Sequence, residues 1–359
     1  MKSAWLTTGP LVSKFEAALA NTTGAKDAVV VSNGTAALHT AMHSLGIGPG
    51  DEVIVPAMTF AATANAVLYC GGRPVFADVE PDTLLISTES VASLIGPKTR
   101  AIATVDYAGQ PCDYDALYDI VTGRNIPIVA DACHALGGHY RNRPVGSVAD
   151  ITAFSFHPVK QITTGEGGAV VSNVQEYSAR ARVFRNHGIT TDHRQREQAG
   201  SWLYEMVELG FNYRITDFQC ALGISQLEKL GRWVERRREI ADIYAELLAD
   251  MADVRPLSIR PGMGHAFHLY VIRVLAGTGG AGRARLFHYL RDKGIGVNVH
   301  YYPVHLHPFY QRTMGTRPGL CPVAERAYEE ILSLPMFPAM KDSDVHRVVE
   351  TLSEGLADS

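Results

Sequence analysis

The stretch D-A-V-V-V-S-N-G-T-A-A-L-H-T-A-M-H-S-L at residues 27–45, followed by E-V-I-V-P at residues 52–56, decides the fold class of this chain. Two short runs rich in β-branched residues flank a segment with a helical pattern. A strand, a helix and a second strand in this order form a β-α-β unit, in which the helix crosses over between two parallel strands. The sequence therefore predicts an α/β fold built around a mostly parallel sheet.

The same alternation continues along the chain and predicts five further buried strands. They are R-P-V-F-A (73–77), R-A-I-A-T-V-D (100–106), I-P-I-V-A-D (126–131), I-T-A-F-S-F (151–156) and G-A-V-V-S (168–172). Helical patterns cover residues 60–70 and, as a crossover before Pro127, residues 113–123. We therefore expect about seven strands in one sheet.

The pattern changes after Thr216, where we expect one long helix. It should run through D-F-Q-C-A-L-G-I-S-Q-L-E-K-L (217–230) into W-V-E-R-R-R-E-I-A-D-I-Y-A-E-L-L (233–248) and leave the first lobe near residue 235. The arginines around Arg237 are expected to form a solvated face of this helix. The helix thus marks the passage from one lobe to the next.

A smaller α+β unit is predicted beyond this helix. Its elements are a strand H-L-Y-V-I-R-V (268–274), a helix R-A-R-L-F-H-Y-L-R (283–291), a strand V-N-V-H-Y-Y (297–302) and a helix after Asp342. We therefore expect a large domain at residues 1–235 and a small C-terminal domain at residues 236–359.

Composition limits the classes of function. The 359 residues exceed the usual size of one hydrophobic core, so two lobes are expected. Hydrophobic residues make up 46% and charged residues 19% of the chain, which excludes a disordered protein. The net charge of −4, with basic residues spread along the chain, gives no electrostatic footprint for nucleic acid or a membrane surface. We expect small-molecule substrates, no nucleic-acid partner and no membrane partner.

Cysteine usage and the chain start favour a cytoplasmic location. The five cysteines are scattered and form no C-x-x-C pair, which is typical of reduced thiols. The segment M-K-S-A-W-L-T-T-G-P at residues 1–10 lacks an apolar signal core. No segment approaches the roughly 18 uninterrupted apolar residues of a membrane span.

Lys160 is the first candidate for chemistry. It lies in F-S-F-H-P-V-K-Q-I-T-T-G-E-G-G (154–168), just after a predicted buried strand and between Val159 and Ile162. Burial disfavours the ammonium form and lowers the pKa of a lysine, which leaves a neutral amine that can form a Schiff base with an aldehyde. A lone lysine is more often a surface charge, and the G-E-G-G turn (165–168) is equally compatible with a tight hairpin.

Asp131 is the second candidate because it ends a predicted strand. The carboxyl ends of the strands form the edge at which open α/β sheets bind ligands. A carboxylate at this edge can keep a pyridine nitrogen protonated, and the protonated ring is an electron sink for carbanion chemistry. A helix cap and a metal ligand remain alternatives for Asp131, the second because His134 follows three residues later.

A phosphate site is indicated where the first strand meets its helix, at Ser32-Asn33-Gly34-Thr35. Backbone N–H groups and the Thr35 hydroxyl at a positive helix N-terminus suit a phosphate, although the same string is also an ordinary helix start. Phe60, which opens the third element, can stack on a planar ring, although single aromatic residues more often belong to a core. Each of these signals is weak by itself.

The order of the signals along the chain is what favours a single site. A phosphate turn, an aromatic residue and strand-end Asp131 are followed by Ser155, five residues before Lys160. At these residues the chain resembles the sugar-nucleotide aminotransferases of the DegT/DnrJ/EryC1/StrS family. The resemblance runs nearly end to end, and its most specific segments are D-A-C-H-A-L-G (131–137), F-S-F-H-P-V-K-Q-I-T-T-G-E-G-G-A-V-V (154–171), F-R-N-H-G-I-T (184–190) and G-F-N-Y-R-I-T-D-F-Q-C-A-L-G (210–223).

The resemblance implies an aspartate-aminotransferase-like fold, which is fold type I of the pyridoxal-phosphate-dependent transferases, and pyridoxal 5'-phosphate (PLP) as cofactor. Lys160 would be the Schiff-base lysine that also moves protons during amine transfer, and Asp131 would pair with the pyridinium. The other implied cofactor contacts are Phe60 on the ring, His134 near the ring hydroxyl, and Gly34, Thr35 and Ser155 at the phosphate. Asn212 would reach the phosphate of the neighbouring subunit's cofactor, so a homodimer with shared active sites is implied.

Within the family, three segments are most similar to the UDP-4-amino-4,6-dideoxy-N-acetyl-β-L-altrosamine transaminases of pseudaminic acid synthesis. They are V-D-Y-A-G-Q-P (105–111), F-R-N-H-G-I-T (184–190) and V-N-V-H-Y-Y-P-V-H (297–305). By that resemblance, L-glutamate gives its amino group to the position-four ketone of a UDP-linked 6-deoxy-sugar. His187, Tyr301 and His305 are the candidates for contact with this sugar nucleotide.

Structural roles remain alternatives for two of these three residues. Tyr301 can instead pack inside the small lobe, and His305 can form a surface pair with His307. Family members also usually carry a further helix-forming segment ahead of the W-L-T-T-G-P motif, whereas Met1 lies four residues ahead of Trp5 here. Either the nucleotide contacts at this end differ from those of the relatives, or the start is misassigned.

Other functions are compatible with parts of the sequence. A related PLP-dependent sugar dehydratase carries histidine in place of the lysine, so Lys160 argues against it. A non-catalytic sugar-nucleotide binder or transcription regulator would lack the reaction with glutamate, and no helix-turn-helix segment is recognisable. A metalloenzyme using Asp131, His134 and His139 matches no metal-ligand spacing, so the sequence predicts no metal. Amination at position three of the sugar remains an alternative to position four.

Overall fold

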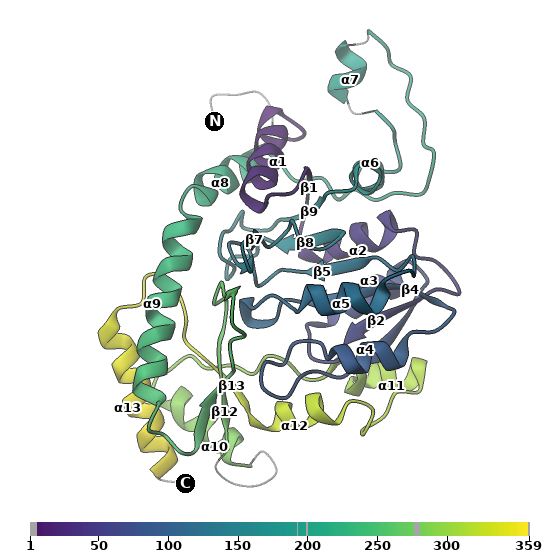
Figure 1. Ribbon diagram of the computed structural model, residues 1–359. Coiled ribbons are helices and arrows are strands. Elements are labelled where there is room, and N and C mark those ends of the chain that lie inside the picture. The colour runs from purple at the N-terminus through teal and green to yellow at the C-terminus, as the bar shows by residue number, and fades with distance from the viewer. Residues whose placement is uncertain (1–5, 192, 199, 276–280, 358–359) are drawn as a thin grey trace.

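A seven-stranded sheet forms the centre of the molecule (Figure 1). The computed structural model describes residues 6–191, 193–198, 200–275 and 281–357, so Trp5 lies outside the described residues. The strands, in sheet order, are β1 (Asp27–Val31), β9 (Gly168–Ser172), β8 (Ile151–Ser155), β5 (Ile128–Asp131), β4 (Thr99–Val105), β2 (Glu52–Pro56) and β3 (Arg73–Ala77). Only β9 runs antiparallel to its two neighbours. The seven predicted strands and the mostly parallel sheet are confirmed.

Helices cover both faces of this sheet because the strands are apolar on both sides. In β8, for example, Ala153 belongs to the core that includes helix α2, whereas its neighbour Phe154 packs in the core under α1. The helices of this part are α1 (Pro10–Thr23), α2 (Gly34–Ser44), α3 (Ala61–Tyr69), α4 (Thr88–Leu94), α5 (Tyr114–Val121), α6 (Gln175–Phe184), α7 (His193–Gln198) and the short η1 (Tyr107–Gly109). This alternation confirms the predicted α/β class.

A smaller unit follows, and its core lies between a three-stranded sheet and the three helices α9 (Leu230–Leu248), α10 (Ala281–Asp292) and α13 (Asp342–Ala357). The sheet consists of β10 (Val254–Pro256), β12 (Tyr270–Val274) and β13 (Ile331–Leu334), and a second small sheet joins β11 (Met263–Gly264) to β6 (His139–Tyr140) and β7 (Arg143–Pro144). The remaining helices of the described chain are α8 (Asp217–Leu227), which packs against α1, and η2 (Val304–Leu306), α11 (Pro308–Met314) and α12 (Pro322–Glu330), which pack against the core of the large sheet. The α+β character agrees with expectation, while the boundary at residue 235 falls inside α9 and stays a prediction.

Two predicted elements differ from the structure. The long helix after Thr216 is two helices, because the Lys229 N–H donates to Gln226 O in a tighter turn between α8 and α9. The predicted strand at residues 297–302 is not a strand: Asn298 forms an isolated bridge to Ser333, and the chain then turns away toward the large sheet. Irregular backbone therefore carries His300 and Tyr301.

Arg237 corrects a third expectation, since it is buried and does not belong to a solvated face. Its guanidinium donates to the backbone oxygens of Phe267 and Met336, both at 2.9 Å. Arg237 shares the inward stripe of α9 with Val234 and Tyr244, which lie three residues before and seven residues after it. Helical spacing, rather than charge, decided which arginine of the triplet faces the protein.

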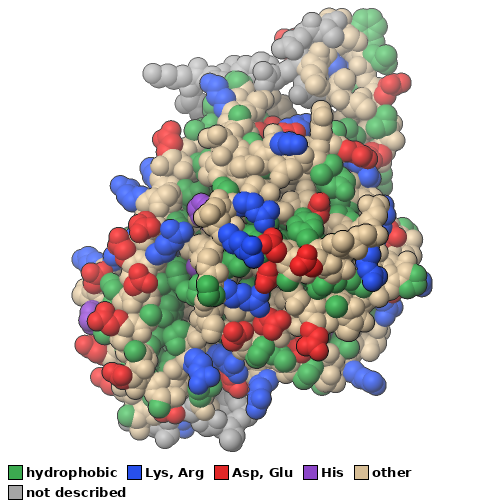
Figure 2. All heavy atoms as spheres, in the orientation of Figure 1, with side chains coloured by type: hydrophobic (Ala, Val, Ile, Leu, Met, Phe, Trp, Pro, Cys, Tyr) green, Lys and Arg blue, Asp and Glu red, His purple; other side chains and the backbone are tan. Residues whose placement is uncertain are grey.

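The surface carries both signs of charge without separation on the face drawn in Figure 2. Among the described residues, no helix has the length and apolar composition to cross a membrane. All five cysteines are free thiols. The structure thus offers no single-sign field that would select a polyanionic partner on that face.

Candidate active site

Neighbouring strands of the large sheet bring Asp131 and Ser155 to one edge. β5 ends at Asp131 and β8 ends at Ser155, and the two strands run parallel with Asp131 opposite Ala153. The connection from β8 to β9 carries Lys160, whose N–H donates to His157 O at 2.9 Å. The pairing of Ser155 with Gly168 then brings the chain back into the sheet. Asp131, Ser155 and Lys160 therefore lie at, or just beyond, the edge formed by the carboxyl ends of the strands.

The start of α2 packs directly against Ser155. Asn33 caps the helix, and its side chain accepts a hydrogen bond of 2.8 Å from Ala36 N. A Cβ atom on Gly34 would lie 2.7 Å from Ser155 Cβ, so only glycine lets the helix start approach this closely. The N–H groups of Gly34 and Thr35 have no partner within the helix because they open its first turn. The structure thus brings Gly34, Thr35 and Ser155 together as a small polar cradle.

The Asp131 carboxylate is buried and held at both oxygens. Thr63 donates to Oδ2 at 2.6 Å, and the Cys133 N–H donates to Oδ1 at 3.2 Å. Thr63 lies in the first turn of α3, and its hydroxyl is also 2.8 Å from the Thr59 hydroxyl. The carboxylate is therefore fixed in orientation, as expected for a group that must face one atom of a ligand.

Lys160 lines a cavity of about 1310 Å³ between the large sheet and the small unit. Burial lowers the pKa of the Lys160 ammonium, and the nearby Cys133 and Asp131 oppose this effect only in part. Its Nζ lies 3.5 Å from His268 Nε2, at the long end of hydrogen-bond distances. The expected desolvated lysine is thus present, at a position that lines the cavity.

Histidines and Tyr301 form the wall opposite Asp131. The Tyr301 hydroxyl lies 3.1 Å from His134 Nε2, and the rings of His134 and His268 are 4.3 Å apart. Burial and the neighbouring Lys160 lower the pKa values of both histidines well below the ordinary range, so both are neutral. The Nδ1 atoms of His134 and His268 are buried without a partner among the described residues. Two polar atoms therefore remain for a ligand to satisfy.

Phe60 lies at the mouth of this wall. It precedes the first residue of α3, its side chain is 60% exposed, and its ring is 5.9 Å from that of Tyr301. An exposed aromatic ring beside a buried polar group is available to stack on a planar ligand. The structure therefore brings Phe60 close to Tyr301, as the predicted ring contact requires.

His187 and Asn212 lie at the base of an arm, which the structure describes at residues 187–191, 193–198 and 200–212. The arm leaves α6 and stands apart from the rest of the chain in Figure 1. Its two sides pair through the bridges Asn186 to Asn212 and Ile189 to Met206. Both side chains are exposed. Asn212 precedes Tyr213, whose backbone oxygen accepts from the Ser32 N–H at 2.8 Å, so the base of the arm adjoins the start of the predicted phosphate turn.

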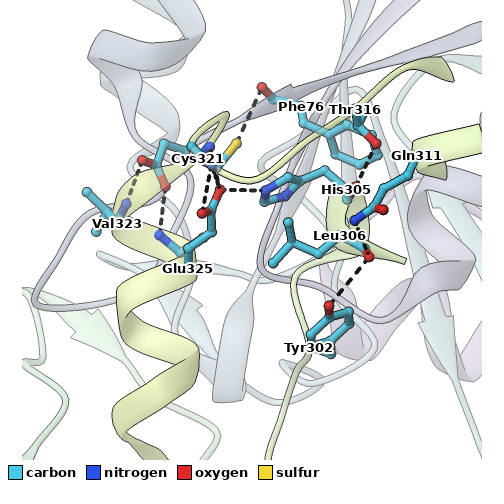
Figure 3. Close-up of polar contacts among 12 residues, drawn as sticks. Phe76, Tyr302, His305, Leu306, Gln311, Thr316, Cys321, Val323 and Glu325 are labelled. Carbon is cyan, nitrogen blue, oxygen red and sulfur yellow. Dashed lines mark hydrogen bonds and ion pairs between the residues drawn. The ribbon is translucent and has the colours of Figure 1, made fainter. Parts of the chain in front are cut away.

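His305 is also separated from the cavity, because its side chain is completely buried. Its Nε2 lies 2.8 Å from Glu325 Oε1, and its backbone oxygen accepts from the Thr316 hydroxyl at 2.6 Å (Figure 3). With no exposed surface, the imidazole has no face to offer a sugar nucleotide in this conformation. The surface pair with His307 is wrong for the same reason, and the partner of His305 is Glu325.

Two contacts of the site were not expected from the sequence. Thr63 and His268 touch Asp131 and Lys160, yet neither belongs to a recognisable local motif. Thr63 looks like an ordinary position in the first turn of a helix, and His268 like the first residue of a predicted strand. Among the described residues, no group of three or more His, Cys, Asp or Glu side chains could hold a metal ion, including the set Asp131, His134 and His139.

Comparison with known proteins places the chain among sugar aminotransferases. Residues 1–353 match the sequence profile of the DegT/DnrJ/EryC1/StrS aminotransferase family. The chain is 38% identical over 356 residues to the spore coat polysaccharide biosynthesis protein SpsC of Bacillus subtilis, with 99% of this chain and 92% of SpsC covered.

Two solved structures share the fold over nearly the whole chain. The putative sugar aminotransferase Spr1654 of Streptococcus pneumoniae, in its pyridoxamine-phosphate form, is 33% identical with a TM-score of 0.93, covering 99% of this chain and 94% of that one. PseC of Helicobacter pylori, an aminotransferase involved in pseudaminic acid biosynthesis, is 31% identical with a TM-score of 0.92 and the same coverage. Spr1654 has also been solved in a PLP form.

Proposed function

The chain belongs to the DegT/DnrJ/EryC1/StrS aminotransferase family, and we propose that it moves the amino group of L-glutamate to the position-four ketone of a UDP-linked 4-keto-6-deoxy-N-acetylhexosamine. The fold is that of fold type I, and the enzyme is a PLP-dependent sugar aminotransferase. The donor, the nucleotide, the sugar and the amination position are the proposed part. The buried contact of Thr63 with Asp131, at the same edge as Lys160, is the observation that carries the site assignment.

The residues at the sheet edge fit PLP. The cradle of Gly34, Thr35 and Ser155 offers N–H groups and hydroxyls for the phosphate, and a side chain on Gly34 would close it. The buried Asp131 carboxylate suits a pyridinium nitrogen. The orphaned Nδ1 atom of His134 is free for the ring hydroxyl. Phe60 is exposed at the mouth of the site, where it can cover the ring.

Bound PLP supplies an electron sink that stabilises negative charge next to the transferred nitrogen. The role of Asp131 is to keep the ring nitrogen protonated, and Thr63 fixes the direction of that carboxylate. Lys160 takes and returns a proton through Nζ. Burial lowers the pKa of Lys160 and so increases the fraction of the side chain that is a free amine, able to accept a proton, at neutral pH. The neutral imidazoles of His134 and His268 leave Lys160 without a competing positive charge beside it.

Similarity to PseC supports the choice of sugar. Both chains match along nearly their whole length, and PseC is involved in pseudaminic acid biosynthesis. The position of Tyr301 supports a contact with the substrate, because its hydroxyl lies beside His134 in the wall next to Lys160. His305 is not part of the proposed contact set, because it is fully buried against Glu325. The related SpsC and Spr1654 make another nucleotide-sugar 3- or 4-aminotransferase the second candidate.

A homodimer with shared active sites is the proposed assembly. Large apolar side chains crowd the exposed arm: Trp202, Leu203, Tyr204, Met206, Val207 and Leu209. Trp202 is 88% exposed, which is unusual for a single apolar residue in a monomer surface and typical of an interface. In a dimer, the exposed side chains of Asn212 and His187 at the base of the arm would face the partner's site.

The aminotransferase assignment of Lys160 is tested by spectroscopy. Unaltered protein loaded with PLP is expected to show a visible absorption band that bleaches on addition of L-glutamate, and Lys160→Ala is expected to lose both responses. Lys229→Ala, which alters a lysine on the surface near Trp233, serves as the control and should retain both. Persistence of the lysine-dependent band in Lys160→Ala would refute the assignment.

The substrate is tested separately by product analysis. Protein in the pyridoxamine-phosphate form is mixed with a panel of UDP- and dTDP-linked 3-keto and 4-keto sugars, and the products are identified by NMR. Amination of the UDP-linked 4-keto-6-deoxy-N-acetylhexosamine at position four, faster than of the other sugars, is expected. Preferential amination at position three, or of a dTDP-sugar, would favour the second candidate, and a deoxygenated product would indicate a dehydratase.

A further inference from the structure

The segment of residues 298–307 lies against the site but has almost no regular structure. It forms one isolated bridge, from Asn298 to Ser333, and ends in the short helix η2. It nevertheless presents the Tyr301 hydroxyl to His134 at 3.1 Å. An irregular segment holds a side chain in a fixed place only when other contacts fix its backbone. The question is which contacts anchor this segment.

Its strongest side-chain anchor is the pair of His305 and Glu325, drawn in Figure 3. His305 is completely buried, and its Nε2 lies 2.8 Å from Glu325 Oε1. The same carboxylate accepts N–H bonds from Gly319 at 2.9 Å and from Cys321 at 3.2 Å. Burial raises the pKa of Glu325, but these hydrogen bonds outweigh burial and lower it overall, so the group is a carboxylate.

The helix that carries Glu325 is itself tied to the large sheet. α12 begins at Pro322, and its Val323 and Ala324 N–H groups both donate to the Asp78 carboxylate at 2.9 Å. Asp78 directly follows β3. The carboxylate satisfies two N–H groups that the first turn of a helix cannot pair internally. Glu325 is therefore fixed relative to the sheet whose edge holds Asp131.

Beyond His305, the segment is fastened to the connection after β2. The Val304 N–H donates to Ala57 O at 2.9 Å, and the Tyr301 N–H donates to Met58 Sδ at 3.4 Å. Tyr107 also donates to His300 O through its hydroxyl. These backbone contacts and the buried imidazole of His305 all tie the segment to its surroundings. Loss of the carboxylate would leave His305 Nε2 buried without a partner, so the segment would have to shift.

We propose that Glu325, acting through His305, is a positioning residue of the active site that holds Tyr301 against His134. Nothing in this role requires Glu325 or His305 to touch the substrate. The proposal rests on the function proposed above only in that His134 is assigned to the cofactor and Tyr301 to the substrate. It also gives a role to His305, which sequence similarity made a candidate for substrate contact and which is buried in the structure.

The test compares Glu325→Ala with Glu330→Ala. Both residues lie on α12, are about one-fifth exposed and pair with a basic side chain, but the partner of Glu330 is Arg273 on β12, outside the segment. Glu325→Gln, which keeps one accepting oxygen, serves as the conservative variant if Glu325→Ala folds poorly. Two readouts are independent of any sugar: hydrogen–deuterium exchange of residues 298–307, and the pH midpoint of the visible absorption band of PLP-loaded protein.

Glu325→Ala is expected to speed exchange of the segment, with the Val304 amide as marker, by about tenfold, which is the effect of losing one buried hydrogen bond. It should also shift the pH midpoint in the same direction as Tyr301→Phe, with no further shift in the double variant, because both act on one contact. Glu325→Gln should lie between, and Glu330→Ala should change neither readout.

Three results would overturn the proposal. They are unchanged exchange of residues 298–307 in Glu325→Ala, faster exchange with an unaltered pH midpoint, and additive shifts in the double variant. An equal effect of Glu330→Ala would also overturn the proposal, because it would show that Glu325 only stabilises the small unit in general. A failure of the glutamate or sugar assignment would leave both readouts measurable, so the two failures are distinguishable.

Discussion

The Thr63 hydroxyl lies 2.6 Å from Asp131 Oδ2, although the two residues are 68 positions apart in the chain. They meet because α3 begins beside the carboxyl edge of the sheet, at which β5 ends. The contact fixes the orientation of a buried carboxylate, and it depends on neither residue's immediate neighbours in sequence. The following predictions start from this contact and extend to the rest of the site.

Replacing Thr63 should weaken catalysis through Asp131. Thr63→Val keeps the shape and removes the donor to Oδ2, and a hydrogen bond to a charged group is worth roughly 1.5–3 kcal/mol. We expect kcat/KM for amine transfer to fall on the order of 10–100-fold. Thr63→Ser keeps a hydroxyl and should retain most of the activity. Equal rates for the Val and Ser variants would contradict the role of this bond.

Asp106 should make the protein less stable as the pH rises. Burial, mainly, raises the pKa of Asp106 to about 7 in the folded chain, whereas an unfolded aspartate has a pKa of about 3.9. The folded state therefore binds the extra proton between about pH 4 and pH 7, and the stability from this proton is lost across that window. Asp106→Asn cannot ionise, so its stability relative to the unaltered protein should increase by a few kcal/mol between pH 5 and pH 8.

Urea unfolding at several pH values measures this difference. The amide of Asp106→Asn still offers an oxygen to the Cys112 N–H and the Tyr114 hydroxyl, which bond to Oδ1 at 2.9 and 2.8 Å. The variant should therefore fold. Parallel pH profiles for the variant and the unaltered protein would show that Asp106 does not titrate in this range.

A side chain at Gly34 should weaken cofactor binding. The Cβ atom of Gly34→Ala would lie 2.7 Å from Ser155 Cβ, so the start of α2 or the end of β8 must move. Such overpacking costs about 1–3 kcal/mol, and we expect the Kd for PLP to rise about tenfold or more. Gly48→Ala is the matched control, because its Cβ would meet nothing within 4 Å. Equal PLP affinity in both variants would place the phosphate elsewhere.

Polar substitution on the arm should weaken self-association. Trp202→Ser removes the most exposed large apolar side chain of the arm, and aromatic residues at interface centres commonly contribute 2 kcal/mol or more. We expect a dimer Kd raised by about thirtyfold in sedimentation experiments. Ile259→Ser alters an exposed apolar residue outside the arm and should leave the Kd unchanged. A monomeric unaltered protein would contradict the proposed dimer directly.

Much of the fold was predictable because it depends on local pattern. The seven strands of the large sheet are short apolar runs, and burial on both faces makes such runs visible in sequence. The positions of Asp131 and Ser155 at strand ends followed from the same runs, because parallel strands bring their carboxyl ends to one edge. Lys160 did not follow from its position alone: the order of the weak signals along the chain and the family resemblance singled it out.

The failures concern residues whose partners are distant in the chain. Arg237 was expected in solvent because it is charged, yet α9 turns it inward onto the carbonyls of Phe267 and Met336. His305 was expected to contact a ligand, but its side chain is buried and pairs with Glu325. The charge and type of a residue do not reveal which group it will hydrogen-bond in the folded chain. A polar side chain can be buried wherever the fold supplies a hydrogen-bond partner for it.

The family resemblance proposed Lys160 and Asp131 as the centre of the site. The sequence by itself determined the order of strands and helices along the chain and the edge of the sheet at which Asp131 and Ser155 lie. These depend on periodicity, burial and residue type, which are local properties of the chain. Only the tertiary structure decided that Thr63 bonds to Asp131, that His268 lies beside Lys160, and that Glu325 pairs with the buried His305. Such contacts join segments that are far apart in sequence, and their distances exist only once the sheet, α3 and α12 have packed together.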